Sequence, residues 1–287
     1  MITVAIVGPG RVGTLLGVAV ARAGWRLVAV AGGQDAARAA LCRTVAGARP
    51  YPTAVEAAAQ AELTLLCVPD DALERVASDL ASAGAVGEHD RVVHLAGSQG
   101  LAPLHRVGLT GAGIAACHPA MTVPQGAEDP ELLVGVAWAV TASEHDRGWA
   151  EELVTTLGGD PHRVPEDARG LYHAGLTVGA NAVGAATATA RRLLLAARID
   201  RPEAFLAPLI EASVANVLTR GAQALTGPIV RGDTTTIATH LARIGEDVPE
   251  LLPAYRALAR ATLAPVRVTL EPATVARLDE LLADPEA

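Results

Sequence analysis

The sequence contains no lysine, and all 23 of its basic residues are arginines. A guanidinium group stays protonated at physiological pH, so it cannot form a Schiff base or donate a proton as an ammonium group can. Covalent catalysis by lysine, a Walker-type phosphate loop and a lysine general acid are therefore excluded. Any catalysis must use other side chains.

Aromatic residues and positive charge are also scarce. The chain has three tryptophans, three tyrosines and one phenylalanine, and its net charge is −8. Proteins that bind nucleic acid use basic side chains against the phosphates and aromatic rings that stack on the bases. We therefore expect no nucleic acid among the partners of this protein.

Cysteine is limited to three widely spaced positions, Cys42, Cys67 and Cys117. An odd number without a Cys-x-x-Cys pair is typical of a reducing compartment, which predicts a cytoplasmic protein, and we expect no metal site. The N-terminus has no basic segment before its apolar run, so it does not resemble a secretory signal. The uncharged stretch from Ala174 to Ala190 is too weakly apolar for a membrane span, and we expect a buried helix there.

A chain of 287 residues is long enough for two domains, because single cores stop growing near about 250 residues. The first half alternates short apolar runs with alanine-rich helical segments such as Arg11 to Ala23, a pattern typical of a parallel sheet covered by helices on both faces. The predicted strands are Ile2 to Val7, Leu27 to Ala31, Leu63 to Val68, Val92 to Ala96, Gly113 to Cys117 and Val136 to Thr141, with His162 to Val164 as a further candidate.

From Pro165 onward only helical periodicity remains. One helix of about 30 residues is predicted from Glu166 to Ala197, because its acidic start and basic end suit the helix dipole. Further predicted helices are Pro202 to Leu225, Thr234 to Ile244, Val248 to Leu263 and Ala273 to Leu282. We thus predict an α/β domain with a doubly wound, mainly parallel sheet over residues 1–165 and an all-α domain over residues 166–287.

A glycine-rich turn directly follows the first predicted strand. It reads Gly8-Pro9-Gly10-Arg11-Val12-Gly13 and leads into a helix, which is the full setting of a dinucleotide-binding fingerprint. Gly8 allows the tight turn, Gly10 leaves space for a pyrophosphate, and Gly13 lets helix and strand pack closely. The alternative is a tight glycine turn without a ligand.

The second strand ends without the acidic residue that NAD-specific sites use for the ribose hydroxyls. Two glycines and a glutamine follow it, and Asp35 lies slightly beyond. Arg11, Arg38 and Arg43 are candidates for contact with a 2′-phosphate, although the latter two could equally form a solvated helix face. The pattern favours NADP over NAD.

Ligands of open parallel sheets bind beyond the carboxyl ends of the strands, and two further turns there carry candidate cofactor contacts. Val68-Pro69-Asp70 would run along the cofactor, although Asp70 or Asp71 is also a simple N-cap for the next helix. Gly97-Ser98 would lie beside the nicotinamide or form only a flexible turn.

Cys117-His118-Pro119 follows the fifth predicted strand. An imidazole at that edge can bond to a substrate oxygen, so His118 is a catalytic candidate with a structural histidine as the alternative. Cys117 is expected to be a small buried residue.

Polar residues also interrupt the predicted helices of the second domain. His173, Thr177 and Asn181 recur every four residues and so share one face of the long helix. Asn181 and Asn216 are the only asparagines in the chain, and a buried amide needs a partner. We expect each either to join two helices or to contact substrate or nicotinamide. Arg231, in a loop, suits a bidentate grip on a carboxylate or phosphate, with a structural salt bridge as the alternative.

Together these features resemble the two-domain oxidoreductases related to 6-phosphogluconate dehydrogenase, pyrroline-5-carboxylate reductase and ketopantoate reductase, and most closely the bacterial branch whose C-terminal half is a domain of unknown function. The resemblance covers nearly the whole chain. It implies NAD(P) binding, a helical second domain of the 6-phosphogluconate dehydrogenase type and a homodimer in which the long helix packs against its mate. Besides the glycine turn, it is carried by Val68-Pro69-Asp70, His118-Pro119, Tyr172-His173 with Asn181, and Thr226-Gly227-Pro228 through Arg231-Gly232-Asp233 to His240.

Two departures limit what the resemblance implies. His118-Pro119 is similar to the His-Pro-Met segment of prephenate dehydrogenases, whose histidine is catalytic, but Ala120 stands third in this sequence. Hydroxyacid dehydrogenases and ketopantoate reductases use a lysine on the long helix, four residues before an asparagine, and that position is Thr177. Catalysis by a lysine acid therefore cannot be carried over.

The sequence thus predicts hydride transfer between NADP(H) and a small carbonyl or imine substrate, expected to be acidic, with 2-dehydropantoate as one candidate. His118 or His173 would donate a proton or polarise the substrate, and Asn181 would orient it. Asn216 and Arg231 would bind it. The alternative is a non-catalytic sensor or scaffold that binds NADP.

Overall fold

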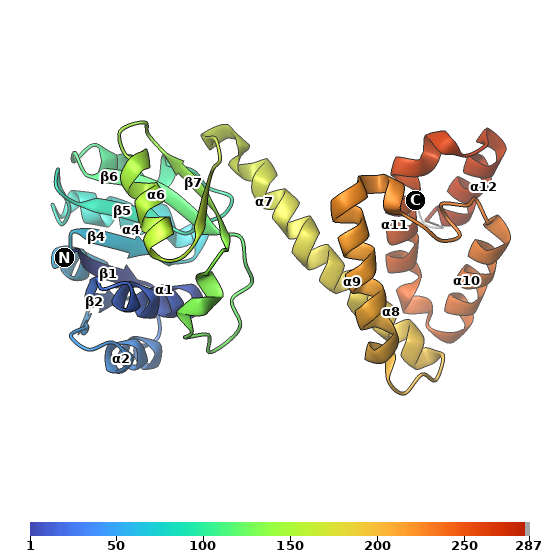
Figure 1. Ribbon diagram of the computed structural model, residues 1–287, viewed down its shortest axis with the longest axis horizontal. Helices are drawn as coiled ribbons and strands as arrows, with labels where there is room; N and C mark the ends of the chain where they lie inside the picture. The colour runs from blue at the N-terminus through green and yellow to red at the C-terminus, as the bar shows by residue number, and fades with distance from the viewer. Residues whose placement is uncertain (285–287) are drawn as a thin grey trace. The chain divides into compact units, whose positions relative to one another are not determined.

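The computed structural model describes residues 1–284, and the chain forms two compact units, residues 1–176 and residue 177 onward (Figure 1). The division falls inside a continuous helical stretch rather than in a loop. The domain boundary near residue 165 stays a prediction. The first unit holds the predicted sheet and the second is helical, so the predicted fold class is confirmed.

The sheet of the first unit has eight strands among the described residues, in the order β3-β2-β1-β4-β5-β6-β7-β8. All neighbours pair in parallel except β6 and β7, which run antiparallel. The carboxyl ends of β1, β4, β5 and β6 therefore lie next to one another at one edge. The strands are β1 (Thr3–Val7), β2 (Arg26–Ala31), β3 (Arg49–Tyr51), β4 (Leu63–Leu66), β5 (Arg91–His94), β6 (Gly113–Pro119), β7 (Ala137–Ala142) and β8 (Asp160–Arg163).

Helices cover both faces of this sheet. On one face α1 (Arg11–Arg22), α2 (Asp35–Thr44) and α6 (Arg147–Thr156) share a core cluster with the strands, and α1 and α6 lie in front of the strands in Figure 1. On the other face the cluster includes side chains from α3 (Ala54–Ala58), α4 (Asp70–Ser82) and α5 (His105–Gly108). The buried residues of α4 recur at helical spacing: Leu73, Val76, Ala77 and Leu80.

The two edge strands differ from the buried ones in composition. In the central strand β1, Val4 to Val7 are all buried, whereas β3 and β8 each contain a proline and remain largely exposed. Proline cannot donate to a strand ladder, so edge positions suit it. The sequence did not predict β3, which is only three residues long. The predicted run at residues 162–164 corresponds to β8.

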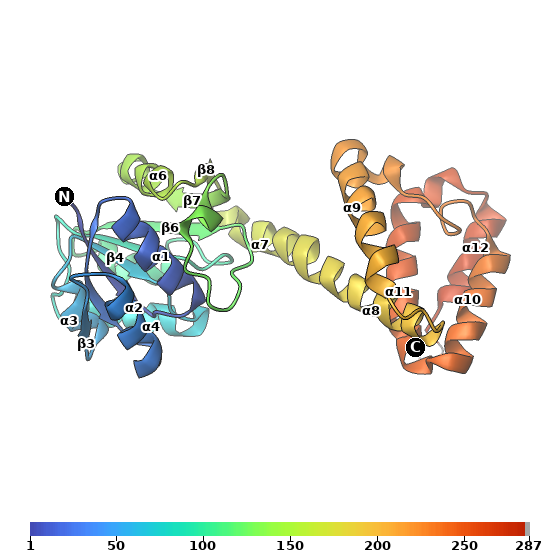
Figure 2. The ribbon, with the colours of Figure 1, turned by 60° about the horizontal axis from the view of Figure 1, so that its bottom comes forward.

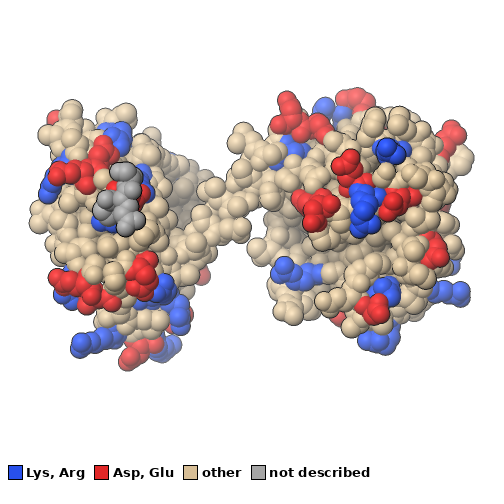
Figure 3. Space-filling model, turned by 180° about the vertical axis from the view of Figure 1, so that it is seen from behind, with Lys and Arg blue, Asp and Glu red and all other residues tan. Residues whose placement is uncertain are grey.

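The single long helix predicted from Glu166 to Ala197 was only partly correct. A 3-10 turn (Glu166–Ala168) leads into α7 (Arg169–Thr177), a π-helical segment (Val178–Ala182) and α8 (Val183–Ala196). A π segment pairs residues five apart instead of four, so it changes the phase of side chains along the stretch. The stretch from Ala174 to Ala190 is helical, but no residue in it is buried in the single chain, so the expected burial was wrong. Charged side chains, drawn blue and red in Figure 3, are absent from residues 170–190.

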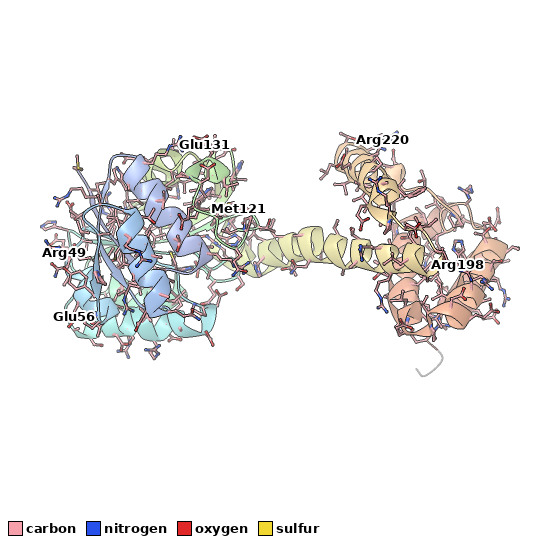
Figure 4. All side chains as sticks on the ribbon, turned by 90° about the horizontal axis from the view of Figure 1, so that it is seen from below. Arg49, Glu56, Met121, Glu131, Arg198 and Arg220 are labelled. Carbon is pink, nitrogen blue, oxygen red and sulfur yellow. The ribbon has the colours of Figure 1, made fainter. Side chains whose placement is uncertain are left out.

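The second unit continues with α9 (Pro202–Arg220), α10 (Thr234–Asp247), α11 (Leu252–Leu263) and α12 (Pro272–Leu282). The turn between α8 and α9 includes Arg198, labelled in Figure 4, whose φ is 63°. Helices α10, α11 and α12 pack side by side (Figure 2) around Ile229, Ile237, Ala259, Leu263, Val266, Leu278 and Leu282. Across residues 1–284, no helix combines the length and the apolar character that crossing a membrane requires.

Candidate functional site

The glycine turn after β1 is held by close backbone contacts. Gly8 has φ +93°, and a Cβ atom there would lie 2.6 Å from the carbonyl oxygen of Cys67. A Cβ atom on Gly13 would lie 2.3 Å from the carbonyl oxygen of Gly8. Both glycines are therefore required by the fold, as the sequence predicts.

Gly10 differs from the other two glycines, because a Cβ atom there would meet nothing within 4 Å. It is the N-cap of α1 and offers no side-chain cap. The first N–H groups of a helix have no partner within the helix and carry the positive end of its dipole. Open space in front of these groups fits a pyrophosphate, so the turn is suited to a dinucleotide.

The end of β2 lacks an acidic side chain at the position expected for NAD. Arg38 lies beside it: its Nη1 is 3.4 Å from the carbonyl oxygen of Gly32, and its Nη2 donates to Asp35 at 2.7 Å. Arg11 points elsewhere and donates to the carbonyl oxygen of Val123 at 3.3 Å. Of the three candidate arginines, Arg38 is thus the one placed at the end of β2.

The turn after β4 corrects one interpretation of the sequence. Pro69 is the N-cap of α4, and Asp70 is the first helical residue instead of the cap. Ser98 Oγ lies 3.3 Å from a carboxylate oxygen of Asp70, and the Gln99 side chain donates to the Asp70 carbonyl oxygen at 3.1 Å. The predicted contacts after β4 and β5 therefore lie together at the carboxyl edge.

His118, the last residue but one of β6, lies at the same edge and meets two residues of α7. Its Nδ1 lies 2.9 Å from the Tyr172 hydroxyl oxygen, and its ring stands edge-on to the rings of Tyr172 and His173, with centroids 5.8 Å and 6.1 Å away. Gly97 lies against both imidazoles, because a Cβ atom there would be 2.5 Å from His173 Cδ2 and 3.0 Å from His118 Nε2. The structure thus brings together His118, His173 and the turn at Gly97.

Burial sets the charge state of this group. It lowers the pKa of His118 to about 4, and the charges of Arg169 and His173 act in the same direction. Burial also raises the pKa of Tyr172, against the opposing effect of Arg169. At neutral pH the site therefore holds a neutral imidazole beside a protonated phenol.

The turn from Leu95 to Leu101 is anchored by two residues that the sequence did not reveal. His94 is fully buried; its Nε2 lies 2.6 Å from the Gly100 carbonyl oxygen, and its Nδ1 accepts from the Ala96 N–H at 3.1 Å. These contacts assign the proton to Nε2, and burial lowers the pKa of this imidazole to about 4. Both carboxylate oxygens of Glu166 accept from the Leu101 N–H, at 2.8 and 2.7 Å.

The predicted residues of the second unit have a different environment from the one expected. Asn181 and Asn216 are both exposed, so the expectation of buried amides was wrong. Asn181 lies in the π-helical segment, and Asn216 accepts a hydrogen bond from Arg220, labelled in Figure 4, at 2.8 Å. Arg231 is exposed in the turn before α10. Because the π segment shifts the phase, a spacing of four no longer places Asn181 on the face of His173.

Two further residues of the first unit belong to the site without having been assigned a role. Tyr172 entered only through the resemblance, and Arg169 looked like an ordinary charged residue near a helix start. Arg169, Tyr172 and His173 are separated by three and four positions, the spacing that places side chains on one helix face. That spacing was the available signal.

Comparisons with known proteins agree with this architecture. Residues 1–119 match the model of a Rossmann-like domain, and residues 136–262 match DUF2520, a domain of unknown function. No curated protein matches the sequence significantly.

Several solved structures share the fold at low identity. A Bacteroides fragilis protein provisionally named an NADP oxidoreductase is 22% identical, with a TM-score of 0.73, and the match covers 92% of this chain and 98% of that one. An imine reductase from Myxococcus stipitatus in complex with NADP+ is 19% identical, with a TM-score of 0.69 and coverages of 96% and 99%. A reductive aminase from Aspergillus terreus in complex with NADPH is 16% identical, with a TM-score of 0.69 and coverages of 98% and 99%.

Proposed function

We propose that this chain, which joins a Rossmann-like domain to a DUF2520 domain, is an NADPH-dependent oxidoreductase that reduces a small carbonyl or imine compound. One observation carries the proposal. The carboxyl edge of the sheet combines an open glycine turn at the start of α1 with a half-buried cluster made of His118, Tyr172 and His173. The first part fits a dinucleotide and the second fits proton transfer.

The cofactor would lie across the carboxyl ends of the neighbouring strands β2, β1, β4 and β5. The turn at Gly10 and the N-terminus of α1 would hold the pyrophosphate, and Arg38 beside the end of β2 would meet the 2′-phosphate. The turns at Val68-Pro69 and Gly97-Ser98 would border the nicotinamide. NADPH supplies the hydride when it is bound there. The NADP-bound and NADPH-bound relatives support this cofactor over NAD.

His118 and Tyr172 would supply the proton that reduction of a carbonyl consumes. If the imidazole carries its proton on Nδ1, it donates to the Tyr172 oxygen, 2.9 Å away, and leaves the phenol proton free for the substrate. The raised pKa of Tyr172 keeps that proton in place at neutral pH. His173 is the alternative donor. This arrangement replaces the lysine that the chain lacks.

The substrate class is supported by two lines of reasoning. Imine reductases and a reductive aminase are among the structures of this fold, which favours a C=N or C=O substrate. Arg231 remains our proposed contact for an acidic group, with Asn181 orienting the substrate and Asn216 beside it. Exchange of Arg231 for Gln should raise KM for carboxylated substrates alone. The resemblance to ketopantoate reductases makes 2-dehydropantoate a specific candidate.

We also propose a cytoplasmic homodimer built on the second unit. Every residue from Glu211 to Arg220 in α9 is exposed in the single chain, including the apolar Val214, Val217 and Leu218. Phe205 and Leu209 of the same helix are 60% and 63% exposed. This much uncovered apolar surface on one helix supports an interface with a second copy of the chain. The free state of all three cysteines suits a reducing compartment.

The deciding experiment follows NADPH oxidation with a cyclic imine, a ketone plus an amine, and 2-dehydropantoate. We expect turnover of at least one, lost on exchange of Tyr172 for Phe or His118 for Asn while NADPH still binds. Tight NADPH binding without turnover of any compound would favour the sensor or scaffold. In that case the two exchanges should leave the ligand response intact.

A further inference from the structure

Arg169, the first residue of α7, is buried to 1% exposure. Its guanidinium makes four hydrogen bonds in the part of the chain that the structure describes, and all go to neutral oxygens. Nε donates to Thr141 Oγ1 at 2.8 Å, and the remaining contacts reach the carbonyl oxygens of Ala96, Ala116 and Ala139. This is a buried cation bonded only to neutral groups.

The four acceptors lie on or directly after three neighbouring strands. Ala96 follows β5, Ala116 lies in β6, and Ala139 and Thr141 lie in β7. The Thr141 hydroxyl in turn donates to the carbonyl oxygen of Val164, at the end of β8. One side chain therefore ties the start of α7 to the strands from which His118 and the Gly97 turn extend.

A tie of this kind does not by itself require a charge. Burying a guanidinium away from a carboxylate is costly, and the nearby carboxylate of Glu166 is bonded to the Leu101 N–H instead. A neutral amide could donate hydrogen bonds at lower cost. The charge is therefore expected to have an effect on a neighbouring group.

The neighbouring groups are those of the proposed active site. The guanidinium lies 6.0 Å from the centre of the Tyr172 ring, one helical turn further along α7. Tyr172 in turn lies 2.9 Å from His118. The charge thus faces both members of the pair that would handle the proton.

We propose that Arg169 is a positioning residue for the His118–Tyr172 pair: its side chain ties α7 to the strand ends, and its buried positive charge lies beside the pair. The reaction that the pair serves rests on the proposed function. The positioning role of Arg169 rests on its contacts. Arg169 itself does not reach solvent, so it is not a substrate contact.

Groups from several elements act on the His118 imidazole. Tyr172, His173 and Arg169 face it from α7, His94 from β5 and Asp70 from α4. Burial is the largest cause of its lowered pKa, followed by Arg169 and His173, whereas Asp70 acts in the opposite direction. Removal of the Arg169 charge should therefore raise this pKa and leave the effect of burial in place.

The test is an NMR titration of protein labelled with ¹³C in its histidines, in which the His118 signal is identified by its loss in His118→Asn. In the wild type we expect His118 to titrate at about pH 4. Arg169→Gln and Arg169→Met should raise this value by about 1 pH unit, because a nearby like charge is removed. Arg169→Lys should leave it low. Arg163→Gln, an exposed arginine of the same unit, is the matched control and should change nothing.

Kinetics then separate positioning from simple packing. In Arg169→Gln, the acid limb of the profile of kcat against pH should move to higher pH together with the pKa of His118. KM for NADPH should stay within about twofold of the wild type. Arg169→Lys keeps the positive charge but loses the planar guanidinium with its several N–H donors. Its pH profile should therefore stay in place while kcat falls.

Several outcomes would overturn the proposal. A wild-type His118 that titrates near pH 6.5 would overturn it, whichever variants fold. A His118 pKa that stays unchanged in a folded Arg169→Gln or Arg169→Met variant would overturn it as well. If neither of those variants folds, the wild-type value and the Lys variant decide. Failure to reduce any substrate would remove the proposed function alone, because the titration does not depend on turnover.

Discussion

The backbone of Gly97 meets the ring of His173 so closely that a Cβ atom on the glycine would lie 2.5 Å from the Cδ2 atom of the histidine. Exchange of Gly97 for Ala should therefore displace His173 and press on His118. A displacement of about 1 Å can cost a factor of about 100 in rate, and we expect kcat to fall by about that factor with little loss of NADPH binding. The control is Gly148→Ala in α6, where a Cβ atom meets nothing within 4 Å. Equal kcat values for the two variants would argue against a role for this contact.

The three glycines of the turn should respond differently to alanine. Gly10→Ala should leave the fold intact, because its Cβ atom enters open space, but this is the space that we propose for the pyrophosphate. We expect a loss of NADPH affinity of at least about tenfold, or about 1.4 kcal/mol. Gly13→Ala places its Cβ atom against the Gly8 carbonyl and should lower the thermal midpoint as well. Fluorescence titration with NADPH and thermal unfolding measure the two effects, and an unchanged affinity in Gly10→Ala would place the cofactor elsewhere.

Arg38 should decide the preference between the two nicotinamide cofactors. Its guanidinium lies beside the end of β2 and is held by Asp35 and the Gly32 carbonyl. Hydrogen bonds to charged groups contribute about 1.5–3 kcal/mol. Arg38→Gln should therefore weaken NADPH binding by about tenfold to about a hundredfold and leave NADH unaffected. Arg43→Gln, further along α2, is the control and should alter neither affinity.

Two imidazoles with lowered pKa values should make the protein sensitive to acid. The pKa values of His94 and His118 are lowered from 6.5 to about 4, mainly by burial. Between these values the unfolded chain binds protons that the native protein does not, so the free energy of unfolding should decrease as the pH falls from 6.5 to about 4. Each histidine adds up to about 1.4 kcal/mol per pH unit to this slope.

Chemical unfolding at several pH values across that window measures the slope. His118→Asn should reduce it by the share of one histidine. His89→Asn, at an exposed position, should leave it unchanged. A wild-type stability that does not vary with pH in this range would contradict the prediction.

The exposed apolar face of α9 predicts a second copy of the chain. Leu218 is 82% exposed, and a charge there would be buried in any interface formed by this helix. Leu218→Glu should convert the dimer to a monomer in sedimentation or light-scattering measurements. Leu109→Glu, at a leucine that is 74% exposed in the first unit, serves as the control and should remain dimeric. A wild-type protein that is monomeric at high concentration would exclude the dimer.

The fold could be predicted where each residue contributes to a clear pattern. The apolar run of β1 and the helical spacing in α4 are such patterns, and the glycine turn is determined by backbone contacts at Gly8 and Gly13. Strand β3 was missed because it is short, exposed and contains Pro50, so that it has no apolar run. Hydrophobic periodicity also cannot separate a spacing of four from one of five, which hid the π-helical segment.

The candidate site was predictable only in part for a related reason. His118 could be found because it ends a strand at the edge where ligands bind. Its bond to Tyr172 joins residues 54 positions apart, and no local pattern contains that information. The buried state of Arg169 is also a tertiary property, because its four acceptors are oxygens of distant strands. The expectation of buried amides at Asn181 and Asn216 failed because an apolar helical pattern does not show that a neighbouring element covers it.

The antiparallel pairing of β6 with β7 has a consequence for how this protein can change in evolution. Because β6 ends and β7 begins at the same edge, residues 120–136 leave and rejoin the sheet on the side that carries the glycine turn. Val123 in this segment already accepts a hydrogen bond from Arg11. Insertions and deletions among the largely exposed residues 124–129 can therefore reshape the rim of the site while the strand pairings and the buried Leu133 stay in place, so selectivity can diverge there between related chains.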